Sequence, residues 1–163
     1  MFLRAYESGS DNRVTILRPS NIYGPGQYAK RHFGVVPALM IAAMRKESFR
    51  LMGSASAKRD FLYIDDFVSA CQMVLVERES NVSETWVLNV ASGVPVALGV
   101  LIETVEKVVG ESISIEALPN RSIDLRDNIL DISEVLNTHW APRHSLEEGI
   151  RETWAWFMRN YAG

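Results

Sequence analysis

Two arginines in polar surroundings are the residues best suited to ligand chemistry in this sequence. Arg59 begins the stretch RDFLYIDD, and Arg121 lies in LPNRSID, three residues before Asp124. A guanidinium stays charged and binds phosphate oxygens through two parallel hydrogen bonds. A carboxylate such as that of Asp124 is a good acceptor for ribose or sugar hydroxyls. If the fold brings the arginines to one cavity, the expected ligand contains a diphosphate.

Simpler interpretations of the polar residues stay open. Most surface arginines are solvated charges, and Arg59 with Asp60 can form a local ion pair worth less than about 1 kcal/mol. The carboxylates of Asp60, Asp65 and Asp66 form an apparent cluster in the sequence, but one of them as a helix cap explains them equally well. No nucleophile, base or oxyanion-binding set accompanies them, so we expect no catalytic residue here. The three histidines lack metal-ligand spacing, and we expect no metal site.

A loop rich in glycine and proline is the second candidate feature. RPSNIYGPGQ, residues 18–27, follows the apolar run VTIL, and ASGVPVA follows the similar run WVLNV. In open α/β sheets, ligands bind beyond the carboxyl ends of the strands. We therefore expect both loops to border a binding site, although turn formation alone also explains their glycines.

Bulk properties exclude several classes of protein. The 163 residues are 47% hydrophobic and 23% charged, as in ordinary soluble globular domains. The formal net charge of −3 argues against a nucleic-acid partner. The single cysteine, Cys71, excludes an intramolecular disulfide and suits the reducing cytoplasm. No apolar run approaches the roughly 20 residues that cross a bilayer, so we expect a cytoplasmic protein without a membrane partner.

Hydrophobic patterns predict alternating strands and helices. The uniformly apolar runs VTILRP and WVLNVA predict strands buried on both faces, and the more amphipathic RLMG, DFLYI and SISIEAL predict a smaller sheet outside them. The alternation predicts an α/β fold with mainly parallel pairing. The main helices are predicted over residues 35–47, 65–78, 97–110 and 145–160.

Several residues mark where these helices begin and end. Asp65 or Asp66 would cap the second helix, and Gly110 would end the third. Ser145 and Glu148 have the spacing of a capping box at the start of the last helix.

The order of the motifs resembles a known family. It is similar to the C-terminal half of an extended short-chain dehydrogenase/reductase of the NAD-dependent nucleotide-sugar epimerase and dehydratase type, typified by UDP-glucose 4-epimerase. The motifs that carry the resemblance are LRPSNIYGPGQ, VVPALM, RLMGSASAKRDFLYIDDFVSA, LNVASGVPVAL, RSIDLRDNILD and LEEGIRETWAWF. The resemblance implies a Rossmann-type α/β fold. Residues 1–163 would supply its last two parallel strands and the small substrate-binding α/β domain, with the N-terminal dinucleotide-binding half absent.

The resemblance also implies a set of site residues. Pro19 and Ser20 would lie along the nicotinamide of NAD, and Asn21 would bond the diphosphate or the sugar. Arg59 would bind the diphosphate, with Phe61 packed beside it. The remaining contacts to the nucleotide would come from Ala38, Leu39, Arg50, Met52, Leu98, Arg121 and Asp124.

Three departures from the family pattern shape the functional expectation. The Gly-rich pyrophosphate fingerprint does not occur, and neither does the Y-x-x-x-K pair in which Tyr is the general base. The family usually has Ser or Thr where Ala97 precedes a helix, a change that costs about 0.5–2 kcal/mol. We therefore expect neither tight NAD binding nor activity from this chain alone.

The interpretations still open concern the role and the partners of the chain. It would bind a nucleotide sugar, and we expect a UDP-sugar, as part of an epimerase. Alternatives are a dehydratase or reductase, a noncatalytic nucleotide-sugar-binding module, or a partner of a separately encoded Rossmann half. The expected assembly is a homodimer or a complex with the missing N-terminal half.

Overall fold

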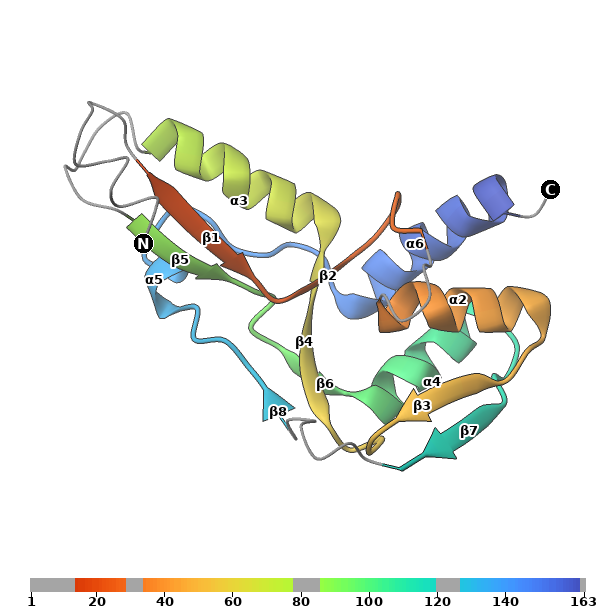
Figure 1. Cartoon of the computed structure of the whole chain (residues 1–163). Helices are drawn as coiled ribbons and strands as arrows, with labels where there is room; N and C mark the ends of the chain where they lie inside the picture. The colour runs from red at the N-terminus through yellow and green to blue at the C-terminus, as the bar shows by residue number, and fades with distance from the viewer. Residues whose placement is uncertain (1–13, 29–33, 78–85, 120–126, 162–163) are drawn as a thin grey trace.

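The computed structural model describes residues 14–28, 34–77, 86–119 and 127–161. Strands and helices alternate along these residues, as the sequence predicts (Figure 1). The elements are β1 (Thr15–Pro19), β2 (Asn21–Tyr23), α2 (Val35–Arg45), β3 (Phe49–Met52), β4 (Lys58–Tyr63), α3 (Ile64–Glu77), β5 (Trp86–Val90), β6 (Pro95–Ala97), α4 (Leu98–Val109), β7 (Ile115–Leu118), β8 (Asp127–Asn128), α5 (Ser133–Leu136) and α6 (Leu146–Tyr161). None of the described helices combines the length and the apolar character needed to span a membrane.

The strands form three small sheets with mainly parallel pairing. β1 pairs with β5 in parallel, which confirms the predicted pair of parallel strands and the α/β fold class. β4 pairs in parallel with β2 and β8 and antiparallel with β6, while β3 pairs in parallel with β7. The prediction of one outer sheet is therefore wrong, because β4 does not join β3 and β7. β2 lies within the segment predicted as a loop.

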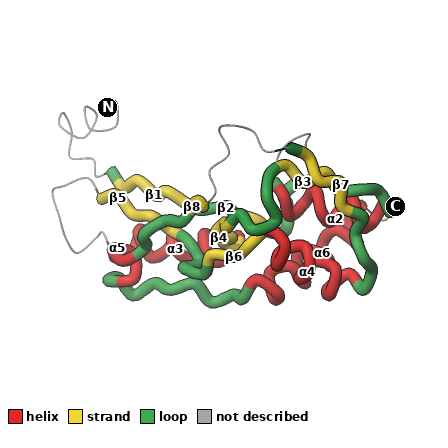
Figure 2. Tube along the Cα trace, turned by 90° about the horizontal axis from the view of Figure 1, so that it is seen from below, coloured by secondary structure: helices red, strands yellow, loops and turns green. Residues whose placement is uncertain are grey.

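Strand β4 connects two hydrophobic cores. Successive side chains of a strand point to opposite faces. Phe61 and Tyr63 accordingly belong to the larger core, which involves α2, α4 and α6, and Leu62 belongs to the smaller core with Leu88 and Val90 of β5. Figure 2 shows the same division, with β1, β5, α3 and α5 at one end and β3, β7, α2, α4 and α6 at the other. A strand that is apolar on both faces thus lies between the two parts.

Strand β1 is less buried than its sequence predicts. Ile16 and Leu17 are only half-buried, and Arg18 and Pro19 are exposed. Within the described residues β1 pairs on one side only, with β5. The prediction of a strand buried on both faces is therefore wrong for β1 among the described residues.

The helix signals hold at two of the sites. Gly110 ends α4 in the left-handed conformation with a φ of 83°. The Ser145 hydroxyl accepts a hydrogen bond from the Glu148 backbone N–H, and the Glu148 carboxylate accepts one from the Ser145 backbone N–H, which confirms the capping box.

Asp66 does not cap α3. The helix begins at Ile64, so both acidic residues that follow lie in its first turn. The Asp66 carboxylate instead accepts hydrogen bonds from the backbone N–H groups of Arg143 and His144, each at 3.1 Å. The prediction of an Asp66 cap is wrong because this buried carboxylate binds a segment that is remote in sequence.

The missing Ser or Thr before α4 is compensated by the backbone. Ala97 offers no side-chain cap. The N–H of Leu98 donates to the carbonyl of Ala57 at 3.0 Å, and the N–H of Gly99 donates to the carbonyl of Ala55 at 2.8 Å. Two of the first N–H groups of the helix are therefore satisfied, and the local cost expected from Ala97 is offset.

Candidate binding site

A cavity of about 760 Å³ lies among α2, β3, β4 and the start of α4. Its volume is in the range typical of small-molecule sites. The sequence-predicted residues that line it are Asn21, Ala38, Arg50, Met52, Arg59, Phe61 and Leu98. The fold thus brings together residues that span 77 positions of the chain.

Local periodicity explains how the elements present these side chains. Arg59 and Phe61 are two positions apart on β4 and share one face of the strand. On α2, Ala38 and Ile41 are three positions apart and share one side of the helix. Alternation along β4 and the turn of α2 therefore direct one charged and several apolar side chains at the same space.

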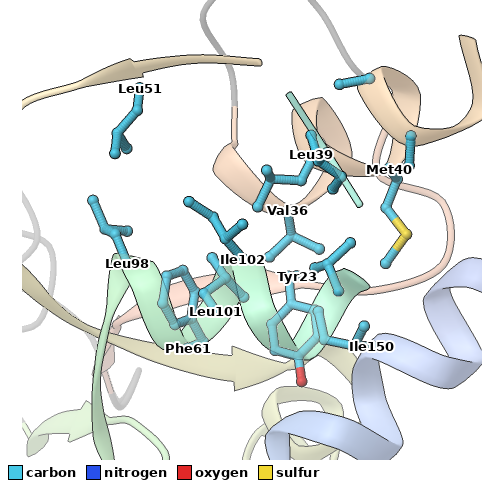
Figure 3. Packing of buried hydrophobic residues seen from close by; sticks show 14 of the residues in the cluster. Tyr23, Val36, Leu39, Met40, Leu51, Phe61, Leu98, Leu101, Ile102 and Ile150 are labelled. Carbon is cyan, nitrogen blue, oxygen red and sulfur yellow. The ribbon is translucent and has the colours of Figure 1, made fainter. Parts of the chain in front are cut away.

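Leu39 is not part of this cavity wall. Its side chain is fully buried in the larger core, together with Val36 and Met40 (Figure 3). Leu39 follows Ala38 by about 100° around α2, and its side chain packs into the larger core. The expected contact of Leu39 with a nucleotide stays a prediction.

A second cavity, of about 330 Å³, borders the loop that follows β1. Asn21 and Phe61 line both cavities, so the two spaces adjoin at these side chains. Ser20 and Gln27 line the smaller cavity but not the larger one. The Oε1 atom of Gln27 is buried and has no hydrogen-bond partner among the described residues. Gln27 thus places an unsatisfied acceptor, itself closed to solvent, next to the smaller cavity. Pro19 lies at the exposed end of β1 and lines neither cavity.

Asp60 organises the loops beside the smaller cavity, a role that the sequence did not reveal. Its carboxylate is fully buried and accepts hydrogen bonds from the Ser20 hydroxyl at 2.9 Å and from the backbone N–H groups of Ser92 and Gly93 at 2.8 and 2.9 Å. The backbone carbonyl of Asp60 also accepts from the Asn21 side chain at 2.8 Å. These donors, and not Arg59, satisfy the carboxylate, so the alternative of a local Arg59–Asp60 ion pair is wrong.

The two arginines of the larger cavity have different surroundings. A guanidinium nitrogen of Arg59 donates to the Lys58 carbonyl at 2.8 Å. Arg50 is paired with Glu116 at 3.0 Å, directly across the parallel strands β3 and β7. Both partners of this second pair are largely exposed, so it contributes little stability, and a phosphate can compete with it. Glu116 is a neighbour that no signal in the sequence pointed to.

Two tyrosines beneath the smaller cavity are held in the neutral form. Burial raises the pKa of Tyr23 above its ordinary value of 10.0, and the charges of Asp66 and Glu152 raise it further. Burial also raises the pKa of Tyr63, followed by its hydrogen bond to Glu152 at 2.6 Å. A phenol with a raised pKa is a poor general base near neutral pH. Neither residue is suited to proton abstraction.

Two predicted contacts, Arg121 and Asp124, lie outside the described residues. The lining also includes a segment that the sequence reasoning missed, namely Glu47, Ser48 and Phe49. Their position between α2 and β3 was a signal, because connections that follow a site-facing helix often border its ligand.

The family assignment follows from comparison with known proteins. Residues 1–91 match the model of the NAD dependent epimerase/dehydratase family, which is more than half of the 163 residues. The chain belongs to this family.

Relatives within the family act on different nucleotide sugars. GDP-L-fucose synthase 1 of Arabidopsis thaliana is 29% identical over 87% of this chain and 45% of its own length. UDP-glucose 4-epimerase of Thermotoga maritima, solved with UDP-glucose, is 28% identical with a TM-score of 0.87 over 98% of this chain and 50% of that one. UDP-N-acetylglucosamine 4-epimerase of Methanobrevibacter ruminantium, solved with UDP-N-acetylmuramic acid, is 27% identical with a TM-score of 0.86 over 97% and 50%. The chain therefore spans about half the length of these relatives.

Proposed function

We propose that this chain forms the nucleotide-sugar-binding portion of an NAD-dependent epimerase, with a UDP-sugar as the favoured ligand. The observation that carries the proposal is the cavity of about 760 Å³, where Arg59 and Asn21 lie beside an apolar wall from Ala38, Met52 and Leu98. A charged donor beside apolar surface suits a ligand that joins a flat base to a phosphate.

The two cavities suit different parts of such a ligand. Arg59 would bind the diphosphate, and the apolar residues of α2 and α4 would pack against the base. Asn21 lies between the cavities and would contact the sugar end of the diphosphate. Gln27 would accept a hydroxyl of the sugar through its buried Oε1 atom. Arg121 and Asp124, which lie outside the described residues, would complete the phosphate and ribose contacts.

NAD would be held mainly by groups that do not occur among these 163 residues. The Gly-rich fingerprint and the Y-x-x-x-K pair are absent from the sequence. The chain offers the cofactor Pro19, at the exposed end of β1, and Ser20, whose hydroxyl is already bonded to Asp60. In the whole protein, NAD would supply reversible hydride transfer at the sugar, while these two residues would only border its nicotinamide.

A second candidate function is a nucleotide-sugar reductase or dehydratase. The observation in its favour is the similarity to GDP-L-fucose synthases, including 27% identity to that of Escherichia coli. The same cavity would then hold a GDP-sugar. A noncatalytic binding module, or a partner for a separate Rossmann half, would also bind its nucleotide sugar in this cavity. In each case the expected setting is the cytoplasm, where a lone cysteine stays reduced.

Calorimetric titration of the full chain with UDP-glucose and with GDP-fucose tests the proposal. We expect saturable binding, tighter for the UDP-sugar. Replacing Arg59 by Ala should weaken binding by about 1.5–3 kcal/mol, the range for hydrogen bonds to charged groups, and Lys should restore little because the planar fork is lost. Arg151→Ala is the matched control, since this arginine pairs with Glu147 on the surface of α6.

Two results would contradict the proposal. One is equal affinity of the wild type and Arg59→Ala for every nucleotide sugar. The other is interconversion of UDP-glucose and UDP-galactose by the purified chain, because we expect no turnover without the Tyr–Lys pair. Tighter binding of the GDP-sugar would favour the reductase alternative.

The partner we propose pairs with β1 along the edge opposite β5. Its half-buried residues Ile16 and Leu17 belong to a strand paired only with β5 among the described residues. Exposed backbone donors and acceptors on such an edge favour pairing with another strand. A second copy of this chain, or a dinucleotide-binding half, would provide that strand.

A further inference from the structure

A histidine and two carboxylates that line neither cavity lie close to one another beside Tyr63. Asp65 lies in the first turn of α3, His144 lies two residues before the first residue of α6, and Glu152 lies within α6. One ligand atom from each side chain lies within 4.8 Å of the others. In the sequence, Asp65 and His144 are 79 positions apart, so no spacing pattern predicts this meeting.

The imidazole of His144 is fixed by groups outside this trio. Its Nδ1 atom is 2.9 Å from a carboxylate oxygen of Asp66, whose side chain is only 3% exposed. The ring also packs against Tyr63, with 4.6 Å between the ring centroids. A histidine that binds a metal typically has its other ring nitrogen bonded to a carboxylate, which fixes the tautomer and the ring orientation. Asp66 and His144 form this arrangement, and Nε2 is the nitrogen left for a ligand.

Negative charge gathers at this point, and the His144 imidazole, paired with Asp66, is a basic group that the structure places against it. Over the described ranges, Asp65 and Glu152 form no ion pair with lysine or arginine. Glu152 accepts a hydrogen bond from the neutral hydroxyl of Tyr63. Three carboxylates therefore surround one imidazole, and a cation would relieve their mutual repulsion.

We propose that Asp65, His144 and Glu152 bind a divalent transition-metal ion such as Zn²⁺. Imidazole and carboxylate oxygen are ligands that Zn²⁺ accepts, with water in the fourth position. With ligands about 2.1 Å from the ion, two ligand atoms are at most about 4.2 Å apart. Asp65 and Glu152 are exposed, so their side chains can close the remaining distance. The ion would join the start of α3 to α6.

The test is titration of the chelator-treated full chain with Zn²⁺ alone, followed by calorimetry and by thermal unfolding. We expect saturable binding and a rise in the unfolding midpoint. Asp65→Asn and Glu152→Gln should each weaken Zn²⁺ binding by roughly tenfold or more, on the scale known for altered metal surroundings. Gln keeps an acceptor for Tyr63, so Glu152→Gln should retain the fold. His139→Asn is the matched control and should bind Zn²⁺ as the wild type does.

Unchanged affinity in both carboxylate variants would overturn the proposal, as would the absence of saturable binding by the wild type. If His139→Asn lost as much Zn²⁺ affinity as the carboxylate variants, the proposal would also be overturned, because the ion would then lie elsewhere. His144→Asn adds a further readout provided that circular dichroism shows a native fold. Nucleotide-sugar binding should be the same in Asp65→Asn as in the wild type.

Discussion

The Ser20 hydroxyl donates a hydrogen bond to the Asp60 carboxylate, with 2.9 Å between Oγ and Oδ1. The same carboxylate binds the backbone N–H groups of Ser92 and Gly93. One buried side chain of β4 thereby holds together the loops that follow β1 and β5. The Ser20 backbone N–H also donates to the Val90 carbonyl at 3.0 Å, so the buried carboxylate and a direct backbone bond together position these loops.

Asp60→Asn should destabilise the protein by about 1–3 kcal/mol, because an amide nitrogen would face an N–H or O–H donor and leave one of them unsatisfied. Urea unfolding followed by circular dichroism measures the change. Glu103→Gln, an exposed position on α4, is the control and should change stability by no more than about 0.5 kcal/mol. Equal stability of the two variants would show that the buried carboxylate is dispensable.

Two glycines in helices should respond to alanine in opposite directions. A Cβ at Gly149 would collide with the Tyr23 hydroxyl and approach Tyr63 to 2.8 Å, whereas a Cβ at Gly99 would come no closer than 3.5 Å to the Ala55 carbonyl. We expect Gly149→Ala to lower the free energy of unfolding by about 1–3 kcal/mol through overpacking. Gly99→Ala should raise it by roughly 0.5–1 kcal/mol, because alanine is the better helix former. Chemical denaturation of both variants checks the signs, and stabilisation by Gly149→Ala would contradict the packing described here.

The capping box of α6 should be visible in the acid range. The Ser145 hydroxyl donates to the Glu148 carboxylate at 2.6 Å, and this bond, followed by the Ser145 backbone N–H, lowers the Glu148 pKa below its ordinary value of 4.5. A lowered native pKa means that the contribution to stability is present above the ordinary value and is lost as pH falls through the lowered one. We expect Ser145→Ala to move the Glu148 pKa toward its ordinary value and to flatten the pH dependence of stability in that window.

NMR titration of the glutamate carboxyl groups measures this shift. Glu147 serves as the internal control, because the Lys107 hydrogen bond is the first cause of its lowered pKa. Its pKa should stay low in Ser145→Ala. An unchanged Glu148 pKa in this variant would remove the capping box as the cause.

Light scattering should show a mass above the 18.3 kDa of one chain. The reason is the edge of β1, where Ile16 and Leu17 are half-buried. Replacing Ile16 by Lys should shift the population toward the monomer, since charged residues discourage pairing between strand edges. Lys at Val100, an exposed position on α4, is the control. A folded wild-type monomer at high protein concentration would contradict the proposed pairing.

Local signals in the sequence predicted the helices well. Gly110, and Ser145 with Glu148, act through hydrogen bonds and backbone conformations within a few residues, so the sequence contains what is needed to interpret them. Strand pairing was predicted less well. Both β3 and β4 are short apolar segments, and only tertiary contacts decide that β4 pairs with β2 while β3 pairs with β7.

The sequence likewise indicated some features of the candidate site and missed others. Arg59, Phe61 and Leu98 line one cavity, and their contacts with a nucleotide sugar stay a prediction. The role of Asp60 was missed because its three partners are the side chain and backbone of residues 32 to 40 positions away. The motif also named Leu39, which packs in the larger core, and its contact with a nucleotide stays a prediction.

Within the part of the chain that the structure describes, the carbonyls of Ala55 and Ala57 cap the start of α4. Both donors, the N–H groups of Leu98 and Gly99, and both acceptors belong to the backbone. A substitution of the Ala97 side chain therefore removes neither hydrogen bond. Insertion or deletion in the segment 53–57 is different, because it would move both acceptors at once. The helix that supplies Leu98 to the cavity is therefore tolerant of changes in residue type at its N-terminus and sensitive to the length of a neighbouring loop.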